Sequence, residues 1–476
     1  MTEYEPVIGL EIHVQLATQT KMFCGCALSF GEQPNTRTCP VCLGLPGALP
    51  LPNERAIHFG LMIGLAVDSE LAPRSIFHRK NYFYPDLPKG YQISQYDEPL
   101  CRGGRLGDVR IHRVHLEDDA AKLVHAGSSG RIHGSQSSVV DFNRGGTPLA
   151  EIVTEPDVRS AAQAREWLTL LRTTLRQLGV SDVNMEEGSL RCDANISIRP
   201  VGESALGTKT ELKNMNSFRF IERGINAEVA RQEGLLEAGD IVTQETLHFD
   251  PRTESITSMR SKEEAHDYRY LPEPDLVPVA ITTRMLDDAR DAMPELPAAR
   301  EERLEGLGIA AANARQLAWR SELGDYFEAA LEAGDASLDP QPLANWVCNE
   351  LVARVGEEDP AASRVAPEAL AKLVGLVDAK DVTVSNAKVV LDRLVADGGD
   401  PAAIVEAEGL GALGGGDDAL DPIVEAALAA NADAAEKIRA GNMKAIGAII
   451  GHVMRETKGR ADGGEVTRIV REKLGV

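Results

Sequence analysis

The feature that most constrains the fold of this chain is a change of hydrophobic pattern near residue 290. Before it, short segments alternate apolar and polar residues, as strands do when one face of an antiparallel sheet is buried. After it, apolar residues recur at helical spacing in long stretches rich in Ala, Leu and Glu. The segment Met293–Pro297 marks the boundary, because proline ends regular elements. We therefore predict an α+β chain, with an antiparallel-sheet cradle domain at 1–292 and an all-helical region after it.

A second change of composition lies at Pro401–Pro422, which holds five acidic residues, no basic residue and the glycine-rich run 409–416. That run contains the spacing G-x-G-x-x-G, but it lies in an acidic connector rather than after a buried strand, so we interpret it as a flexible loop. From Asn431 onward nine Lys and Arg face six acids. We predict a helical domain at 293–400, then a linker and a small basic helical tail at 401–476.

The net charge of −23, from 50 Lys and Arg against 73 Asp and Glu, argues by itself against a nucleic-acid ligand, since phosphates attract clustered cations. A sum does not locate the charges, however. No apolar run reaches the ~20 residues of a membrane span, and the acidic start Met1–Glu5 does not resemble a signal peptide. We expect a cytoplasmic protein.

Four of the seven cysteines form two close pairs with 12 residues between them, namely Cys24, Cys26, Cys39 and Cys42. This spacing is typical of a tetrahedral zinc site with four thiolate ligands. Two disulfides are the alternative, which a cytosolic setting disfavours. Four protein ligands leave no position for a water molecule, so we predict a structural zinc.

Three alternating segments place polar residues together on one face. Ile8–Leu16 brings Glu11 beside His13, Arg191–Arg199 brings Asp193 between Arg191 and Asn195, and His115–Asp119 groups His115, Glu117 and Asp119 with Asp118 opposed. Solvated faces are the simplest explanation, but an exposed face does not need His13 beside Glu11. Carboxylates with one or two histidines suit a hard cation such as Mg²⁺, which indicates phosphate chemistry.

Common nucleotide and hydrolase motifs are missing from the sequence: there is no G-x-x-x-x-G-K-[ST], no protein-kinase signature set and no G-x-S-x-G elbow. The segment His78–Tyr96 instead packs five aromatic and four basic or imidazole side chains into 19 residues. Cations interleaved with rings suit the end of a single-stranded nucleic acid. For some of the rings, a proline-rich loop packed on the sheet is the alternative.

Several long motifs together resemble the B subunit of the aspartyl/glutamyl-tRNA amidotransferase family. They are Ile8–Leu16, Arg79–Tyr96, Asp141–Val153, Met185–Asn195, Glu211–Ser217 and Tyr268–Asp275. The resemblance spans essentially the whole chain. It implies a cradle domain, a helical domain and a tail that holds the tRNA body. It also implies a heterotrimer, in which the partners are an amidase (glutaminase) that frees ammonia from glutamine and a small C subunit.

The reaction that this resemblance implies corrects misacylated tRNA. ATP phosphorylates the side-chain carboxylate of Glu-tRNA(Gln) or Asp-tRNA(Asn), and ammonia then displaces phosphate to give the amide. Phosphorylation supplies the leaving group that a carboxylate lacks, and its catalysis is mostly positioning and charge neutralisation. The chain would thus be part of a carbon–nitrogen ligase that takes nitrogen from glutamine.

By similarity, the ATP and Mg²⁺ centre is assigned to six residues: Glu11, His13, Glu117, Asp118, Glu151 and Asp193. Of these, His13, Glu117 and Glu151 are the expected Mg²⁺ ligands. Lys80 and Lys89 are expected to contact phosphate or the acceptor end, Tyr82 to stack on the terminal adenosine, and Glu186 or Glu187 to accept a proton at the ammonia outlet. The family commonly has a second Glu where this chain has Asp118, which reaches one methylene less.

Two other interpretations stay open at this point. The related archaeal E subunit acts only on Glu-tRNA(Gln), but it carries an inserted domain for which this chain has no room. A non-catalytic tRNA-binding scaffold with a zinc knuckle is the second, and the acidic faces at Glu11 and Asp193 argue against it. The sequence does not decide between Asp-tRNA(Asn), Glu-tRNA(Gln) or both as substrates.

Overall fold

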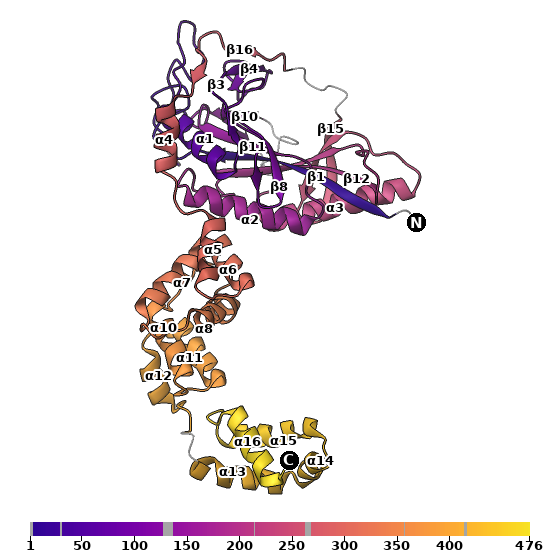
Figure 1. Ribbon diagram of the computed structural model, residues 1–476. Helices are drawn as coiled ribbons and strands as arrows, with labels where there is room; N and C mark the ends of the chain where they lie inside the picture. Colours follow the sequence, from indigo (N-terminus) through magenta and orange to yellow (C-terminus); the bar gives the residue numbers. More distant parts are fainter. Residues whose placement is uncertain are drawn as a thin grey trace. The chain divides into compact units, whose positions relative to one another are not determined.

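The computed structural model of the chain describes residues 3–28, 31–126, 137–213, 215–261, 268–356, 358–413 and 417–476. The chain forms two compact units, Met1–Pro297 and Ala298–Val476 (Figure 1). Two parts of the predicted motifs lie outside the described residues, namely Asn214 and the glycines at 414–416.

The first unit is built on a ten-stranded sheet. Its strands are β1 (Tyr4–Gln15), β2 (Glu70–Leu71), β6 (Cys101–Arg102), β7 (Arg105–Leu106), β8 (Val109–Asp118), β11 (Pro148–Thr154), β12 (Leu190–Pro200), β13 (Thr210–Lys213), β14 (Glu245–Asp250) and β15 (Ser255–Ser261). They are ordered β15-β14-β13-β12-β1-β11-β8-β6-β2, with β7 paired to β8. β13 and β14 run parallel, whereas the other pairs are antiparallel. The predicted antiparallel sheet is therefore mixed at one pair, and the α+β class is confirmed.

One face of this sheet is apolar and covered by helices. In β1, Ile8, Leu10 and Ile12 have no exposed surface, while Glu11 and His13 on the other face are half-buried, as the alternation predicts. The apolar face shares one core with the three helices α1 (Glu54–Ala66), α2 (Ala161–Gln177) and α3 (Phe218–Glu237). Figure 1 shows α2 and α3 lying along the strands on the same side. The opposite face, which carries Glu11 and His13, is not covered by these three helices.

The beginnings of these three helices are encoded locally. Asn53, Ser160 and Ser217 are the N-caps, and each side-chain oxygen accepts a hydrogen bond from an amide of the first turn. Such caps satisfy amide groups that the helix itself leaves unpaired.

Short strands complete the first unit. A three-stranded sheet is ordered β16-β4-β5, and two-stranded sheets join β9 to β10 and β3 to β17. Their bounds are β3 (Arg74–Ser75), β4 (His78–Asn81), β5 (Tyr91–Ser94), β9 (Lys122–Ala126), β10 (Ser137–Asp141), β16 (Leu271–Pro272) and β17 (Val279–Ala280), and the helix α4 (Thr283–Asp291) follows. The amide of Ile93 donates to Asp118 at 2.8 Å, so β5 is fastened to the end of β8. The aromatic and basic segment 78–96 is therefore a hairpin that packs beside the sheet.

The second unit is helical, as predicted. Its first group of helices is α5 (Pro297–Gly306), α6 (Ala311–Trp319), α7 (Ser321–Ala333), α8 (Pro340–Asn345), the π-helix η1 (Trp346–Leu351), α9 (Val352–Val355), the 3-10 helix η2 (Pro360–Ala362), α10 (Pro367–Asp378), α11 (Val384–Asp397) and α12 (Pro401–Glu408). Leu317, Phe327, Leu343, Leu370 and Leu391 lie in their common core. Among the described helices, none combines the length and apolar character that a membrane crossing requires.

Residues 401–410 differ from the expected linker. They form α12 and its end, and Ile404, Val405 and Leu410 pack against the core of the preceding helices. Two of the acidic residues that suggested a connector have partners in other helices, since Glu408 pairs with Arg393 and Asp421 pairs with Lys473. Asp400, just before this stretch, caps α12 and pairs with Lys372 at 2.6 Å. The sequence did not indicate these pairs, because the basic partners lie in other helices and not within the acidic stretch.

The last group of helices has a core of its own, which includes Ile438, Ile449 and Val453. It consists of α13 (Asp417–Ala430), α14 (Ala432–Arg439), the 3-10 helix η3 (Met443–Ala445), α15 (Ile446–Glu456) and α16 (Gly463–Leu474). Part of its basic charge is paired internally, since Lys473 lies 2.8 Å from Asp421 and Arg468 lies 2.7 Å from Glu465.

Candidate functional site

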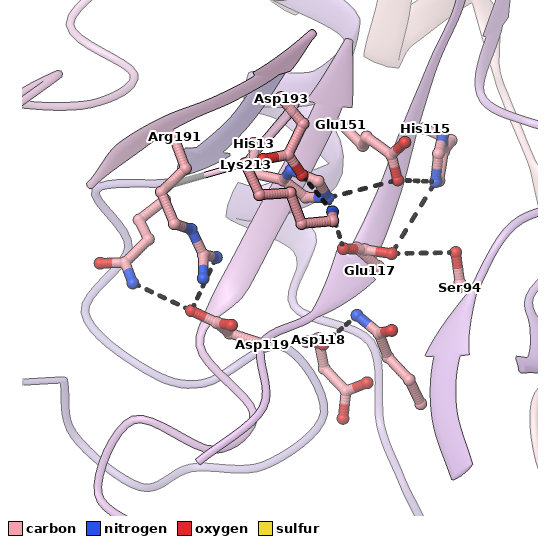
Figure 2. Close-up of polar contacts among 12 residues, drawn as sticks. His13, Ser94, His115, Glu117, Asp118, Asp119, Glu151, Arg191, Asp193 and Lys213 are labelled. Atoms are coloured by element: carbon pink, nitrogen blue, oxygen red, sulfur yellow. Dashed lines mark hydrogen bonds and ion pairs between the residues drawn. The ribbon is translucent and has the colours of Figure 1, made fainter. Parts of the chain in front are cut away.

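The register of three neighbouring strands brings the predicted histidine and carboxylates together. His13 on β1 lies opposite Glu151 on β11, and Glu151 lies opposite His115 on β8. Residues opposite each other in a sheet share a face, and Glu117, two residues after His115, shares it too. Four polar side chains from three strands therefore point to the same side (Figure 2).

Three of these side chains form what we call the histidine–carboxylate cluster, His13, Glu117 and Glu151. His13 Nε2 lies 3.6 Å from Glu117 Oε1 and 3.6 Å from Glu151 Oε2, and one ligand atom of each residue lies within 4.8 Å of the others. Glu117 and Glu151 are buried. One imidazole and two carboxylates are a donor set that fits a hard divalent cation, which would otherwise bind water or phosphate oxygens.

Two residues that the sequence motifs did not assign to the site hold this cluster. His115 Nε2 lies 3.0 Å from Glu151 Oε2 and 3.9 Å from Glu117 Oε2, and the Ser94 hydroxyl donates to Glu117 at 3.2 Å (Figure 2). His115 is 2% exposed, and within the described part of the chain its Nδ1 has no hydrogen-bond partner. The shared strand face could have identified His115, whereas nothing near Ser94 in the sequence indicates its contact.

The electrostatics of the cluster favour the ionised form of Glu151. Burial alone would raise the pKa of Glu151, but its interactions with His115, including a hydrogen bond, and with His13 and Lys80 hold that pKa well below its usual range. Burial likewise opposes the charge on Lys80, yet the carboxylates Glu117 and Glu151 outweigh it and raise the Lys80 pKa above its ordinary value. The site therefore combines anionic oxygens with a lysine that remains charged.

The four predicted zinc cysteines also come together. Their sulfur atoms lie within 4.8 Å of one another, and all four residues are half-buried. The amide of Cys39 donates to Cys42 Sγ at 3.2 Å. The pKa of Cys42 is lowered to about 4, mainly because Cys24 hydrogen-bonds to it, with the Cys39 amide and the Lys21 charge adding. Four clustered sulfurs with amide support fit a tetrahedral zinc ion. We call residues 24–42 the cysteine knuckle.

Comparison with known proteins identifies the family. Residues 6–287 match the family described as the GatB/GatE catalytic domain, and residues 325–474 match the one described as the GatB domain. The chain belongs to the GatB/GatE family. Proteins named as the B subunit of aspartyl/glutamyl-tRNA(Asn/Gln) amidotransferase are similar over their full length. The one from Frankia casuarinae is 48% identical over 100% of this chain and 97% of its own. Those from Anaeromyxobacter sp. (strain K) and Persephonella marina are 47% and 46% identical over at least 99% of both chains. The predicted resemblance is confirmed.

Glu11 and Asp193 of this GatB/GatE chain lie on the polar face but outside the histidine–carboxylate cluster. Glu11 accepts a hydrogen bond from Asn195 at 2.8 Å. Asp193 lies 2.5 Å from Lys213 Nζ (Figure 2). The same Nζ is 2.9 Å from Glu211. Lys213 is thus a further cation of this face, on β13, that the sequence motifs did not assign to the site.

Asp118, which the resemblance assigns to the ATP and Mg²⁺ centre without naming it a metal ligand, lies outside the histidine–carboxylate cluster. Figure 2 shows its carboxylate directed away from Glu117, as expected for neighbouring residues of a strand. It pairs with Lys89 at 2.5 Å, and both line a cavity of about 200 Å³ that extends to Cys24 and Cys42. Lys89 is therefore engaged by Asp118 and not directed at the cluster.

Tyr82 and the residues at 186 and 187 take positions that the motifs did not specify. The Tyr82 ring meets Tyr268 edge-on at 5.9 Å, and Lys80 Nζ lies 4.9 Å from the centre of the Tyr268 ring. Asn81 holds the segment that carries Tyr268 close by donating to the carbonyl of Arg269 at 2.8 Å.

Glu186 and Glu187, the residues expected at the ammonia outlet, are exposed on the turn before β12, where their amides donate to Asn184.

Proposed function

We propose that this chain is the tRNA-dependent subunit of an amidotransferase that converts Glu-tRNA(Gln), Asp-tRNA(Asn) or both into the amidated forms. ATP phosphorylates the side-chain carboxylate of the misattached amino acid, with ADP as the product. Ammonia then attacks the acyl carbon and releases phosphate. The observation that carries this proposal is the histidine–carboxylate cluster, with the charged Lys80 beside it, in a chain similar over its whole length to proteins named as the B subunit.

The chain's own residues fit the electrostatic needs of this reaction. Phosphoryl transfer between two anions needs positive charge and fixed positions more than covalent chemistry. His13, Glu117 and Glu151 would hold Mg²⁺, which when bound neutralises phosphate charge. His115 and Ser94 fix the two carboxylates, and Lys80 and Lys213 supply cations on the same side of the sheet. The cysteine knuckle would hold a structural zinc ion, with no coordination position left for chemistry.

The cellular setting of this proposal follows from the reaction. Ammonia has to come from a glutaminase partner, so the chain would work in a heterotrimer with an amidase and a small C subunit. We place this assembly in the cytoplasm. The whole assembly would be a carbon–nitrogen ligase with glutamine as nitrogen donor. The non-catalytic scaffold is disfavoured because a scaffold has no use for two buried carboxylates held by two histidines.

The test of this function is reconstitution with an amidase partner, ATP, glutamine and each misacylated tRNA in turn. The expected result is ATP-dependent formation of Gln-tRNA or Asn-tRNA, and the tRNA that is amidated defines the substrate. Failure to form either amide while the partner hydrolyses glutamine and the tRNA binds would contradict the proposal.

We also propose that the last group of helices binds the tRNA body. Its exposed cations Lys437, Arg439 and Lys444 lie outside its core. Replacing all three with Ala should raise the KM for tRNA about 10-fold and reduce its dependence on salt, because fewer phosphate contacts release fewer counterions. An unchanged KM and salt dependence would contradict a tRNA-binding tail.

A further inference from the structure

Lys21 is a lysine that is almost completely buried, with 1% of its surface exposed. Its Nζ donates to the carbonyl oxygen of Phe142 at 3.1 Å and lies 3.7 Å from Cys42 Sγ. Among the described residues, its side-chain partners are these two groups, and neither is a carboxylate. Burying a cation without a counter-charge is strongly unfavourable, so the compensating negative charge has to come from the sulfur side.

The cysteine knuckle supplies that charge when it holds a metal. Cysteine binds a metal ion as the thiolate, so four thiolates around a divalent cation leave a net charge of about −2. This charge lies in a half-buried site, where water compensates it only in part. The ammonium group of Lys21 lies beside one of the four sulfurs, Cys42 Sγ, and offers the site a positive charge at this contact.

The Lys21 side chain, through Phe142, and the backbone of the next residue both fasten this segment to the turn that precedes β11. The amide of Met22 donates to the carbonyl of Gly146 at 2.8 Å. Gly146 has a φ of +89°, and a Cβ at this position would lie 3.3 Å from Lys21 Cδ and 3.7 Å from Cys42 Cβ. The positive φ favours glycine at this position, and a Cβ would lie in tight contact with the Lys21 side chain. The turn therefore packs directly on Lys21, and β11, which carries Glu151, starts two residues later.

From these contacts we propose that Lys21 is a charge-compensating and positioning residue of the metal–thiolate site. Its ammonium group balances the negative charge of the loaded knuckle, and its hydrogen bond to Phe142 holds the loaded knuckle on the turn before β11. The inference rests on the proposed zinc site. Its tests measure metal binding and stability, so they are independent of the amidation reaction.

The first test compares Lys21→Met with Lys21→Gln in the full chain. Met keeps the unbranched side chain up to the position of Cε and lacks the ammonium group, and Gln keeps an N–H donor without the charge. Zinc affinity is measured by competition with a chromophoric chelator, and Co²⁺ absorption reports whether four thiolates still bind. Both variants should bind zinc 10- to 100-fold more weakly, the typical effect of removing an outer-shell partner, as roughly estimated. Lys209→Met, at an exposed lysine of the same unit, should match the wild type.

The second test separates charge compensation from packing by a double-mutant cycle with Cys39→Ser, which removes the metal. Lys21→Met should lower the Tm of the zinc-loaded protein and leave the Tm of the Cys39→Ser background unchanged or higher, since an uncompensated buried cation is then removed. Zinc affinity of both Lys21 variants within about threefold of the wild type, against the 10- to 100-fold expectation, or additive changes in the cycle, would overturn the proposal.

Discussion

The two candidate metal sites of the first unit are assembled in opposite ways. The cysteine knuckle takes its four ligands from a single stretch, Cys24 to Cys42. The histidine–carboxylate cluster takes His13, Glu117 and Glu151 from three strands, and it exists only because β1, β11 and β8 pair in one register. A slip of one residue in either pairing would turn a ligand to the opposite face. The first site is specified by spacing and the second by the fold.

The ligand sets of the two sites indicate different tasks. Four sulfurs close a tetrahedral shell and leave no position for a substrate. One imidazole and two carboxylates leave a six-coordinate cation with open positions for substrate oxygens. If this comparison holds, losing a ligand should abolish chemistry at the cluster and mainly weaken structure at the knuckle. Substitutions at four positions test that division, in order of their effect on amidation.

The largest effect is expected for His13→Ala. Removing a ligand of the cluster should lower the rate of ATP-dependent amidation by at least about 10²-fold, comparable to the loss of a major electrostatic contact in a transition state. Glutamine hydrolysis by the partner should stay measurable. The control is His112→Ala, because His112 lies on the same strand as His115 but pairs with Glu155 and is 56% exposed. Equal amidation rates for the two variants would show that the cluster is not part of the active site.

A smaller loss is expected for His115→Gln. His115 holds Glu151 at 3.0 Å without being a member of the cluster, so its removal should weaken the affinity for Mg²⁺ about 10- to 100-fold. The amidation rate should recover largely at high Mg²⁺, which a purely structural defect would not allow. The measurement is the rate as a function of Mg²⁺ concentration, together with a thermal melt. If the variant has an unchanged Tm and high Mg²⁺ does not restore its amidation rate, a positioning role for His115 is contradicted.

Cys39→Ser should act mainly on stability. We expect loss of bound zinc and a lower Tm, by roughly 2–4 °C for each kcal/mol of stability lost in a unit of this size. The amidation rate below the transition should fall only several-fold, a roughly estimated change for a site that is structural. Cys348→Ala, a lone cysteine of the second unit, should keep the zinc content of the wild type. A complete loss of amidation with an unchanged Tm would assign chemistry to the knuckle.

The smallest effect on the metal dependence is expected for Asp118→Asn. Because Asp118 pairs with Lys89 and points away from the cluster, the Mg²⁺ concentration that gives half the maximal rate should not change. The variant should nevertheless be less stable, by up to about 3–5 kcal/mol, since Lys89 is left buried without its partner. Restoring stability with Lys89→Met in the same chain is the matched control. A change in the Mg²⁺ concentration that gives half the maximal rate would show that Asp118 acts at the metal site.

Sequence patterns were most reliable where they are local. The alternation of β1 separates Glu11 and His13 from Ile8, Leu10 and Ile12, and the structure has the same division. They were less reliable where partners are distant. Asp118 and Lys89 were assigned separately to phosphate chemistry but neutralise each other, and the acids around residue 400 pair with lysine and arginine of earlier helices.

The sequence by itself determined the class of the fold, the change from strands to helices, the family and the four cysteines that cluster. Each of these depends on residue type and short-range spacing, which a linear pattern records directly. Only the tertiary structure decided which side chains meet: His115 with Glu151, Asp118 with Lys89, and Lys21 with Cys42. These contacts depend on strand register and on the packing of segments far apart in the chain, so the net charge of −23 could not reveal where cations and acids neutralise one another.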